Sequence, residues 1–307
     1  MSASIFLKSV AKKINNKVII ANLDFGLQKG DRLAIIGANN SGKTILLKII
    51  SGIVDIDSGQ IFINGKNLDS RKYLLRKNIC YIPEYVDFDS NLNIYENLYI
   101  YLRLNKGSND KDSRDLIEYW SKVFQFENML KMTIDRIPMA KLRLVQLCRA
   151  FMHNPEFLIL DHPTKGLDPE NKIWFWSTVN SVLKNSTIIH SSQDFDEIES
   201  FSNRLAFLSE GNIRLNGTIS DIMDKTKEYG SYSITFKDKV DSVMYKEMQE
   251  NDDLYHLKIE GNKIEFYTPK KNIFFEVIRK SLQHDILDVG INSFKLKDVF
   301  LAQVKKI

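Results

Sequence analysis

Cysteine, proline and long apolar runs are all scarce in this sequence. Only two cysteines and six prolines occur among 307 residues, and no apolar run approaches the ~18 residues that a membrane-spanning helix requires. The sequence therefore predicts no transmembrane helix. Cys80 and Cys148 both lie in apolar surroundings, which favours free buried thiols over a disulfide or a metal site. The first residues show no basic segment followed by an apolar core, so no signal peptide is expected.

Blocks of like charge are absent as well. The chain carries 43 Lys and Arg residues against 39 Asp and Glu residues, and its basic residues occur in pairs such as Lys12-Lys13. This charge pattern favours an ordinary solvated surface over a nucleic-acid-binding patch. It is also compatible with a weak attraction to an anionic membrane surface. The hydrophobic content of 43% is ordinary for a globular protein, and the length suits two domains.

The strongest motif is a glycine-containing segment at residues 37–44, called the phosphate loop below, which fits the pattern G-x-x-x-x-G-K-[ST]. An apolar run at residues 32–36 predicts a strand before it, and apolar residues at helical spacing follow at residues 45–50. A glycine turn that binds nothing is the alternative, which these flanks disfavour. The proposed nucleotide-binding residues are Gly37, Ala38, Asn39, Asn40, Ser41, Gly42, Lys43 and Thr44.

The chemistry of phosphate binding explains these residue types. Gly37 and Gly42 can adopt backbone angles that other residues avoid, so backbone N–H groups can converge on phosphate oxygens. The N-terminus of the following helix favours negative charge. Lys43 would reach the β- and γ-phosphates of ATP, and the Thr44 hydroxyl would bind Mg²⁺.

Alternating strand and helix patterns continue along the chain. Residues 157–160 form an apolar run that ends in Asp161, as a central parallel strand does at a nucleotide site. Residues 93–150 have a helical pattern, with Asn93 as the expected first cap. We therefore expect an α/β domain at residues 1–225 with a helical insert at about 93–150.

The pattern changes after residue 225. Residues 229–307 show the order β-α-β-β-α-β, with helices expected near 240–250 and 271–283. This order is typical of ferredoxin-like folds. We therefore expect a second, small α+β domain at residues 229–307.

Together with Lys165-Gly166-Leu167-Asp168-Pro169, these motifs resemble the ATP-binding subunits of ABC transporters over about residues 5–220. Local phrases that fit include Ile50-Ser51-Gly52, Tyr81-Ile82-Pro83 and Ser209-Glu210-Gly211, and residues 296–301 look like the tail of exporter ATPases with a C-terminal accessory domain. The resemblance implies a P-loop NTPase fold of the ABC type with a helical subdomain, binding ATP and Mg²⁺.

In that family two ATP-binding domains close head to tail, and each ATP lies between one phosphate loop and the signature loop, Leu-Ser-Gly-Gly-Gln, of the other domain. Closure of the pair pulls on a membrane permease. The resemblance assigns Mg²⁺ to Thr44, Glu84 and Asp161, the adenine contact to Ile14, and the D-loop to Asp168. The signature falls on Ile137, Pro138, Met139, Ala140 and Lys141.

The sequence departs from the family at several hydrolytic positions. His162 follows Asp161 where the family has a Glu that polarises the attacking water, and Gln193 stands where the family has a switch His. Pro138 removes both the signature hydroxyl and a backbone N–H. Ile14 stands where an aromatic residue usually stacks on adenine. His162 could orient water as a neutral imidazole, but a tolerated replacement at a disused position is favoured.

The resemblance implies an ATP-binding subunit of a transporter, for export, that couples ATP binding and slow or partner-dependent hydrolysis to a permease. The alternative is a non-hydrolysing, ATP-gated scaffold or regulator. An ABC protein acting on ribosomes or DNA is disfavoured, because the sequence has one phosphate loop and no long coiled-coil insert. The implied partners are a permease and a second ATP-binding subunit, with a different subunit favoured over a second copy, and the expected location is the cytoplasmic face of a membrane.

Overall fold

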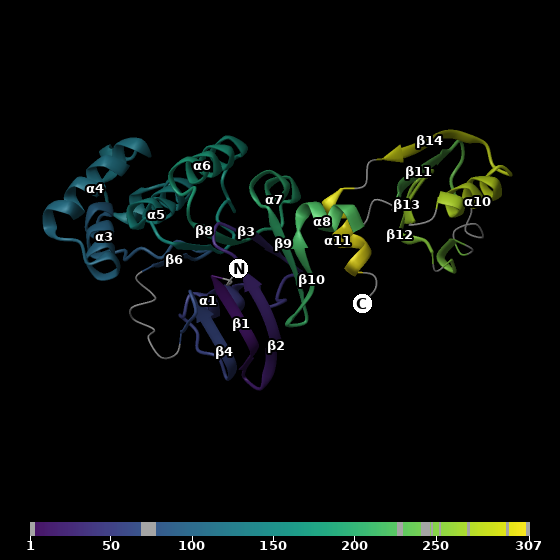
Figure 1. The fold of residues 1–307 in the computed structure, drawn as a ribbon. Coiled ribbons are helices and arrows are strands. Elements are labelled where there is room, and N and C mark those ends of the chain that lie inside the picture. The colour runs from purple at the N-terminus through teal and green to yellow at the C-terminus, as the bar shows by residue number, and fades with distance from the viewer. Residues whose placement is uncertain are drawn as a thin grey trace. The chain divides into compact units, whose positions relative to one another are not determined.

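The computed structural model describes residues 4–68, 78–225, 230–240, 246, 248–251, 253–268, 271–292 and 295–304. The chain divides into two compact units, Met1–Asn216 and Gly217–Ile307 (Figure 1). The boundary expected from the sequence, residues 225–229, falls largely outside the described residues, and the division by contacts falls earlier, inside strand β10 (Asn212–Thr218). That the two units fold independently stays a prediction.

An antiparallel sheet opens the first unit. Its strand order is β2-β1-β4-β5. The strands are β1 (Ile5–Ile14), β2 (Lys17–Leu27), β4 (Ser58–Ile63) and β5 (Lys66–Asn67). Asn15 and Asn16 join β1 to β2 with φ angles of 50° and 62°. Asparagine tolerates this left-handed region, so the pair forms a tight hairpin whose twist matches the strands.

A six-stranded sheet forms the centre of the unit, with the order β10-β9-β3-β8-β7-β6. Its other strands are β3 (Arg32–Ile36), β6 (Ile79–Ile82), β7 (Phe157–Leu160), β8 (Thr187–Ser191) and β9 (Arg204–Ser209). β3 pairs in parallel with β8 and β9, and β7 pairs in parallel with β6 and β8. Because β8 lies between β3 and β7, the segments that follow these three strands meet at one edge of the sheet.

Helices cover the central sheet and form the insert. They are α1 (Lys43–Ile50), α3 (Ile94–Tyr101), α4 (Asp110–Val123), α5 (Met139–His153), α6 (Pro169–Val182) and α7 (Phe195–Phe201). The next helix, α8 (Ile219–Lys225), belongs to the second unit. A π-helical turn, η1 (Leu102–Lys106), and the 3₁₀ turns η2 (Glu127–Met129) and η3 (Ile134–Arg136) complete the insert. The expected cap of α3 is confirmed: Asn93 Oδ1 accepts from Glu96 N, and Glu96 Oε2 accepts from Asn93 N, both at 2.9 Å.

The insert packs around aromatic residues, as the sequence indicates. The rings of Trp120, Phe124 and Phe151 lie 5.2 to 6.0 Å apart. Pairs at this spacing stabilise a core by about 0.5–1.5 kcal/mol beyond their burial. Cys80 and Cys148 are both free and buried, as expected.

The second unit has its own sheet, with the order β12-β13-β11-β14 and antiparallel pairing throughout. The strands are β11 (Gly230–Phe236), β12 (Tyr255–Glu260), β13 (Lys263–Thr268) and β14 (Ile286–Asn292), and α10 (Lys271–Ser281) and α11 (Leu296–Val304) are further helices of this unit. This is the strand order of a ferredoxin-like fold, as predicted. The helix expected near 240–250 lies partly outside the described residues. No helix in the described part of the chain could cross a membrane.

Candidate functional site

The phosphate loop connects the end of β3 to the start of α1, in the strand–loop–helix order that the motif requires. Gly42 is the helix N-cap residue, with φ of 103°, a left-handed conformation that favours glycine. Gly37 has a φ of 158°, a backbone angle that residues with side chains rarely adopt, as the sequence predicts. A Cβ there would also lie 2.2 Å from the carbonyl oxygen of Leu208 at the end of β9.

Lys43 is held inside the phosphate loop. Its side chain is buried, and Nζ donates to the carbonyl oxygens of Gly37 at 2.9 Å and Ala38 at 2.8 Å. Burial lowers the pKa of Lys43, and the nearby charges of Asp161 and Glu84 oppose this shift. The loop therefore holds a cation against two neutral carbonyl groups, where a phosphate oxygen would be a stronger acceptor.

Asp161 lies directly after β7 and is 1% exposed. Its Oδ1 accepts a hydrogen bond of 2.6 Å from Ser191 Oγ at the end of β8, and that same hydroxyl oxygen accepts from His162 N at 2.9 Å. Ser191, which the sequence argument did not single out, thus joins the ends of two neighbouring strands. The sheet order could not be read from the sequence, so no local pattern pointed to this contact.

Glu84, assigned to Mg²⁺ from the resemblance, forms an ion pair with Lys165 in this structure. The hydrogen bond from Lys165 lowers the pKa of Glu84. Among the described residues, no group of three or more His, Cys, Asp and Glu side chains could hold a metal ion. The Asp161 carboxylate and the Thr44 hydroxyl supply oxygen atoms, the ligand type that Mg²⁺ prefers, and together with phosphate oxygens they would hold that ion.

The base and switch positions adjoin this edge of the sheet. His162 is partly buried, with φ of 44°. Burial lowers the pKa of His162, while Asp161 and Glu84 oppose the shift, so the imidazole is neutral near pH 7. Gln193 Nε2 donates to Asn39 Oδ1 of the phosphate loop at 2.8 Å. The fold therefore brings the switch position into contact with the loop.

Arg143 on α5 is a second residue that sequence reasoning missed. Its guanidinium is buried, and it donates to the carbonyl oxygens of Pro83 at 2.6 Å, Pro163 at 3.0 Å and His162 at 3.0 Å. Burial lowers its pKa to about 10, so it stays charged at neutral pH. One side chain thus fixes the segments after β6 and β7. The one sequence feature that pointed to Arg143 was its position two residues after the signature segment at residues 137–141.

The other assigned residues lie elsewhere on the unit. Residues 137–141 lead into and begin α5, where Pro138 caps the helix without a side-chain hydrogen bond and Met139 is 67% exposed. Asp168 caps α6 by accepting from Asn171 N at 2.9 Å. Ile14 is 38% exposed near the end of β1. Within the described ranges, no hydrogen bond joins these residues to the phosphate loop.

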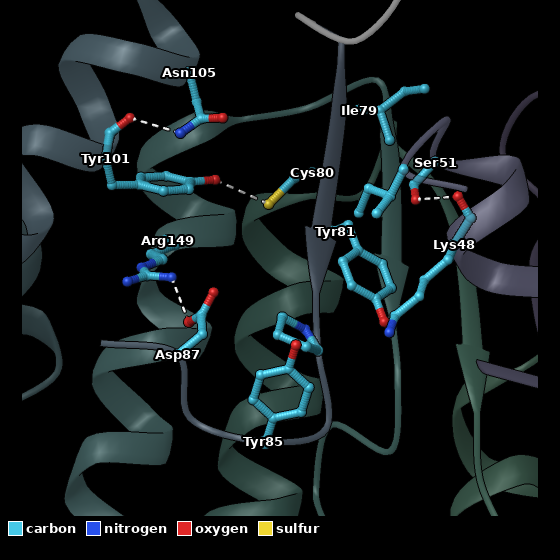
Figure 2. A pocket seen from close by; sticks show the side chains of 12 residues that line it. Lys48, Ser51, Ile79, Cys80, Tyr81, Tyr85, Asp87, Tyr101, Asn105 and Arg149 are labelled. Carbon is cyan, nitrogen blue, oxygen red and sulfur yellow. Dashed lines mark hydrogen bonds and ion pairs between the residues drawn. The ribbon is translucent and has the colours of Figure 1, made fainter. Parts of the chain in front are cut away.

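A pocket of about 430 Å³ lies beside the helical insert, close to the end of α1 (Figure 2). Its polar wall contains the ion pair of Arg149 with Asp87, at 2.7 Å, and Arg149 also stacks over the ring of Tyr101 at 4.9 Å. Lys48 and Ser51, at the end of α1, line the opposite side (Figure 2). No local pattern indicates this pocket, because its lining residues come from four separate stretches of chain.

Comparison with known proteins gives consistent matches. The family model described as "ABC transporter" matches residues 20–165. The Nod factor export ATP-binding protein I of Burkholderia thailandensis is 30% identical over 210 residues, covering 68% of this chain and 69% of the relative. The linearmycin resistance ATP-binding protein of Bacillus subtilis is 27% identical over 222 residues, covering 71% of this chain and 70% of that protein.

Two solved structures have the same fold. The ATP-binding subunit of an ABC transporter matches with a TM-score of 0.66 and 23% identity, over 73% of this chain and 93% of that one. A dimeric ATP-binding cassette in a post-hydrolysis state with ADP and phosphate matches with a TM-score of 0.63 and 19% identity, over 70% of this chain and 98% of that one.

Proposed function

This chain belongs to the ABC transporter family of ATP-binding proteins, and on that premise we propose that it binds Mg-ATP and drives a membrane permease for export. The observation that carries this proposal is the buried ammonium of Lys43, held by the carbonyls of the phosphate loop within the electrostatic reach of Asp161. Export is supported by the names of the relatives, which concern Nod factor export and linearmycin resistance. Through the permease, the chain would lie at the cytoplasmic face of the membrane.

Hydrolysis by this chain's own residues is slow or depends on a partner. A neutral imidazole at His162 can accept a hydrogen bond from water, but it lacks the negative charge of the family's Glu. Gln193 cannot take up or release a proton, and Pro138 has no hydroxyl or N–H to offer a phosphate. Loss of a positioned base commonly costs ~10²–10⁴-fold in rate. The alternative function is a non-hydrolysing, ATP-gated scaffold, which the same three residues support.

Pairing with a different, intact subunit is favoured over pairing with a second copy. Each ATP site would lie between the two subunits of the pair. If both subunits were copies of this chain, both sites would contain His162, Gln193 and the altered signature at residues 137–141. With an intact partner, one site would join this phosphate loop to a good signature and retain ATP for long periods. The second site would combine the partner's phosphate loop, catalytic Glu and switch His with residues 137–141 of this chain. It would still hydrolyse ATP, but slowly.

The experiment is mutation within the membrane complex. Replacing the partner's catalytic Glu should abolish ATP hydrolysis, whereas His162→Ala in this chain should change it little. Loss of hydrolysis in His162→Ala would instead make His162 the working base and exclude the unequal-site arrangement. A purified chain that alone turned over ATP at ordinary rates of ~1–100 s⁻¹ would contradict the impaired site altogether.

The pocket beside α1 is the proposed contact for the membrane partner. Its lining joins the end of α1, whose other end begins at the phosphate loop, to Tyr85, next to Glu84 in the chain. A side chain of the permease inserted there would therefore contact α1, which begins at the phosphate loop, and the segment that contains Glu84. Tyr85→Ala should reduce co-purification of the permease from detergent-solubilised membranes, while Tyr119→Ala, at a similarly exposed tyrosine (60% against 64%), should not. Equal recovery with both variants would exclude this surface.

A further inference from the structure

Strand β14 of the second unit has a row of apolar side chains that the core of this unit leaves exposed. Leu287, Val289 and Ile291 occupy alternate positions of the strand, and Leu287 and Ile291 are 64% and 71% exposed. Val289 and Ile291 oppose Ile234 and Tyr232 of β11, which are buried in the core. They therefore lie on the face of the sheet that carries the core, at its border. An exposed apolar row of this kind marks an interaction site.

β14 is also an edge of its sheet. Among the described strands it pairs with β11 alone, as the order β12-β13-β11-β14 shows (Figure 1). The unpaired N–H and C=O groups of an edge strand are a template for a further strand, and proteins protect such edges with charged residues, proline or a covering helix. The opposite edge strand, β12, carries Lys258 and Glu260 and contacts α11. β14 has no basic residue and no proline, so it lacks this protection.

The sequence of β14 is complementary to itself when two copies run antiparallel about a two-fold axis at Val289. Leu287 of each copy then lies opposite Ile291 of the other, and the two Val289 side chains oppose each other. Asp288, the one charged residue of the strand, lies opposite Gly290, which has no side chain. A shift of the axis to Asp288 would instead set two carboxylates opposite each other, which is destabilising. The charge pattern therefore favours the register that pairs apolar residues with apolar residues.

A lipid surface matches this region less well than a second copy does. Residues 271–292 contain three Lys and Arg residues and three Asp and Glu residues, so their charges give no net attraction to anionic lipid. Pairing of two edge strands forms backbone hydrogen bonds and buries apolar side chains at the same time. A two-fold axis requires one surface that is complementary to itself, as this strand is.

We propose that β14 is a self-association edge, through which two copies of this chain join their second-unit sheets into one continuous sheet. The two β14 strands pair antiparallel, with Val289 on the two-fold axis. This inference goes beyond the proposed function and does not depend on it, because the edge lies outside the unit that contains the phosphate loop. The composite ATP sites belong to the first unit, for which a different subunit remains the favoured partner.

The test measures association of the full chain without nucleotide by sedimentation equilibrium. The wild-type chain should form dimers. Leu287→Lys should raise the dimer dissociation constant at least ~10-fold, because the two-fold axis repeats the lost contact with Ile291 at both ends of the pair. Leu282→Lys is the matched control, since this leucine is as exposed as Leu287 (68% against 64%) but lies outside β14, and it should associate as the wild type does. A monomeric wild-type chain, or equal association of the two variants, would overturn the proposal.

A cysteine on the two-fold axis tests the register. Val289→Cys places two thiols opposite each other, at a Cα separation that a disulfide allows, so diamide should link two chains of this variant and none of Leu282→Cys. The native Cys80 and Cys148 are buried and do not compete. Dimers that diamide fails to link through Val289→Cys would overturn this pairing. So would a monomeric chain whose binding to phosphatidylserine vesicles is abolished by Leu287→Lys.

These measurements separate the self-association edge from the proposed function. A chain that dimerises through β14 but binds no ATP would support this inference and contradict the proposed function. A chain that binds ATP and stays monomeric would do the reverse.

Discussion

At the scale of single residues, two buried cations organise the candidate site. Lys43 and Arg143 are 5% and 3% exposed, and both donate to backbone carbonyl groups. Burial lowers the pKa of each, because it disfavours a charge away from water. Each cation also donates to carbonyl oxygens. Removing either side chain would therefore lose the donor and leave those carbonyl oxygens without a hydrogen bond, which lowers the free energy of unfolding.

Replacing Lys43 should weaken nucleotide binding. Lys43→Ala removes the charged donor to the phosphates, and we expect ATP affinity measured by calorimetry to fall at least tenfold, about 1.4 kcal/mol. Lys48→Ala, on the same helix but at its far end, is the control and should bind as the wild type does. Unchanged affinity in Lys43→Ala, in a chain that melts normally, would contradict the assignment of the loop.

Replacing Arg143 should destabilise the first unit. Arg143→Gln leaves the carbonyl oxygens of Pro83, Pro163 and His162 short of donors, and each unsatisfied buried group costs about 1–3 kcal/mol. Because these costs are not additive, we expect a loss of at least ~2 kcal/mol in the free energy of unfolding measured with urea. The exposed Arg136→Gln should lose less than ~0.5 kcal/mol. Equal losses for the two variants would mean that the carbonyl contacts carry no net stability.

At the scale of elements, β8 is the strand that unites the site. All five of its residues are buried, and it lies between the strand before the phosphate loop and the strand before Asp161. Ser191 at its end contacts the Asp161 carboxylate, and Gln193 just beyond reaches the loop. Within β8, His190 is 1% exposed and its Nε2 lies 2.7 Å from Ser202 Oγ.

The burial of His190 predicts a loss of stability in mild acid. Burial lowers the pKa of His190 to about 3 from 6.5, so the unfolded chain takes up a proton first as the pH falls. The stability contributed by neutral His190 is complete above pH ~6.5 and is lost toward pH ~3, at no more than about 1.4 kcal/mol per pH unit. Wild-type unfolding free energy should therefore fall more steeply between pH 6.5 and 4.5 than that of His190→Gln.

Glu197 is also buried, and its Oε1 lies 4.0 Å from His190 Nδ1. Burial raises the pKa of Glu197 above 4.5, so its contribution has the opposite sign: it is present below that ordinary value and is lost as the pH rises through the raised one. Because the two groups are neighbours, their effects are not additive, so the same pair of proteins is also compared in a Glu197→Gln background. Parallel pH profiles for the two proteins would show that His190 does not resist protonation in the folded state.

At the scale of the whole molecule, two units carry separate cores. The core of the second unit is built from residues of β11, β13 and α10, including Ile234, Phe266 and Phe274. The two solved relatives cover 70–73% of this chain and almost all of their own length. More than a quarter of the chain is therefore additional to the nucleotide-binding fold that they share with it.

Limited proteolysis should separate the two units. Cleavage is expected within residues 222–231, where the sequence pattern changes, and it should leave two pieces that remain folded, because each unit has its own sheet and core. Mass spectrometry of the fragments and circular dichroism of the purified pieces would measure this. A single resistant core that spans residues 222–231 would contradict independent folding.

The sequence by itself determined the local parts of this protein. The phosphate loop, the strand that ends at Asp161 and the helix cap Asn93 all depend on backbone preferences and on hydrogen bonds between near neighbours, which a short pattern contains. The strand order of the second unit also followed the pattern of its segments. For the same reason, the sequence alone shows that His162, Gln193 and Pro138 differ from the residues that the family has at these motif positions.

Only the tertiary structure decided which distant residues meet. The sheet order sets β8 between β3 and β7, and this alone brings Ser191 to Asp161 and Gln193 to Asn39. The ion pair of Glu84 with Lys165 and the carbonyl contacts of Arg143 likewise join separate segments. Such contacts depend on the packing of whole elements, because side chains far apart in the chain can meet only after the strands that carry them have paired.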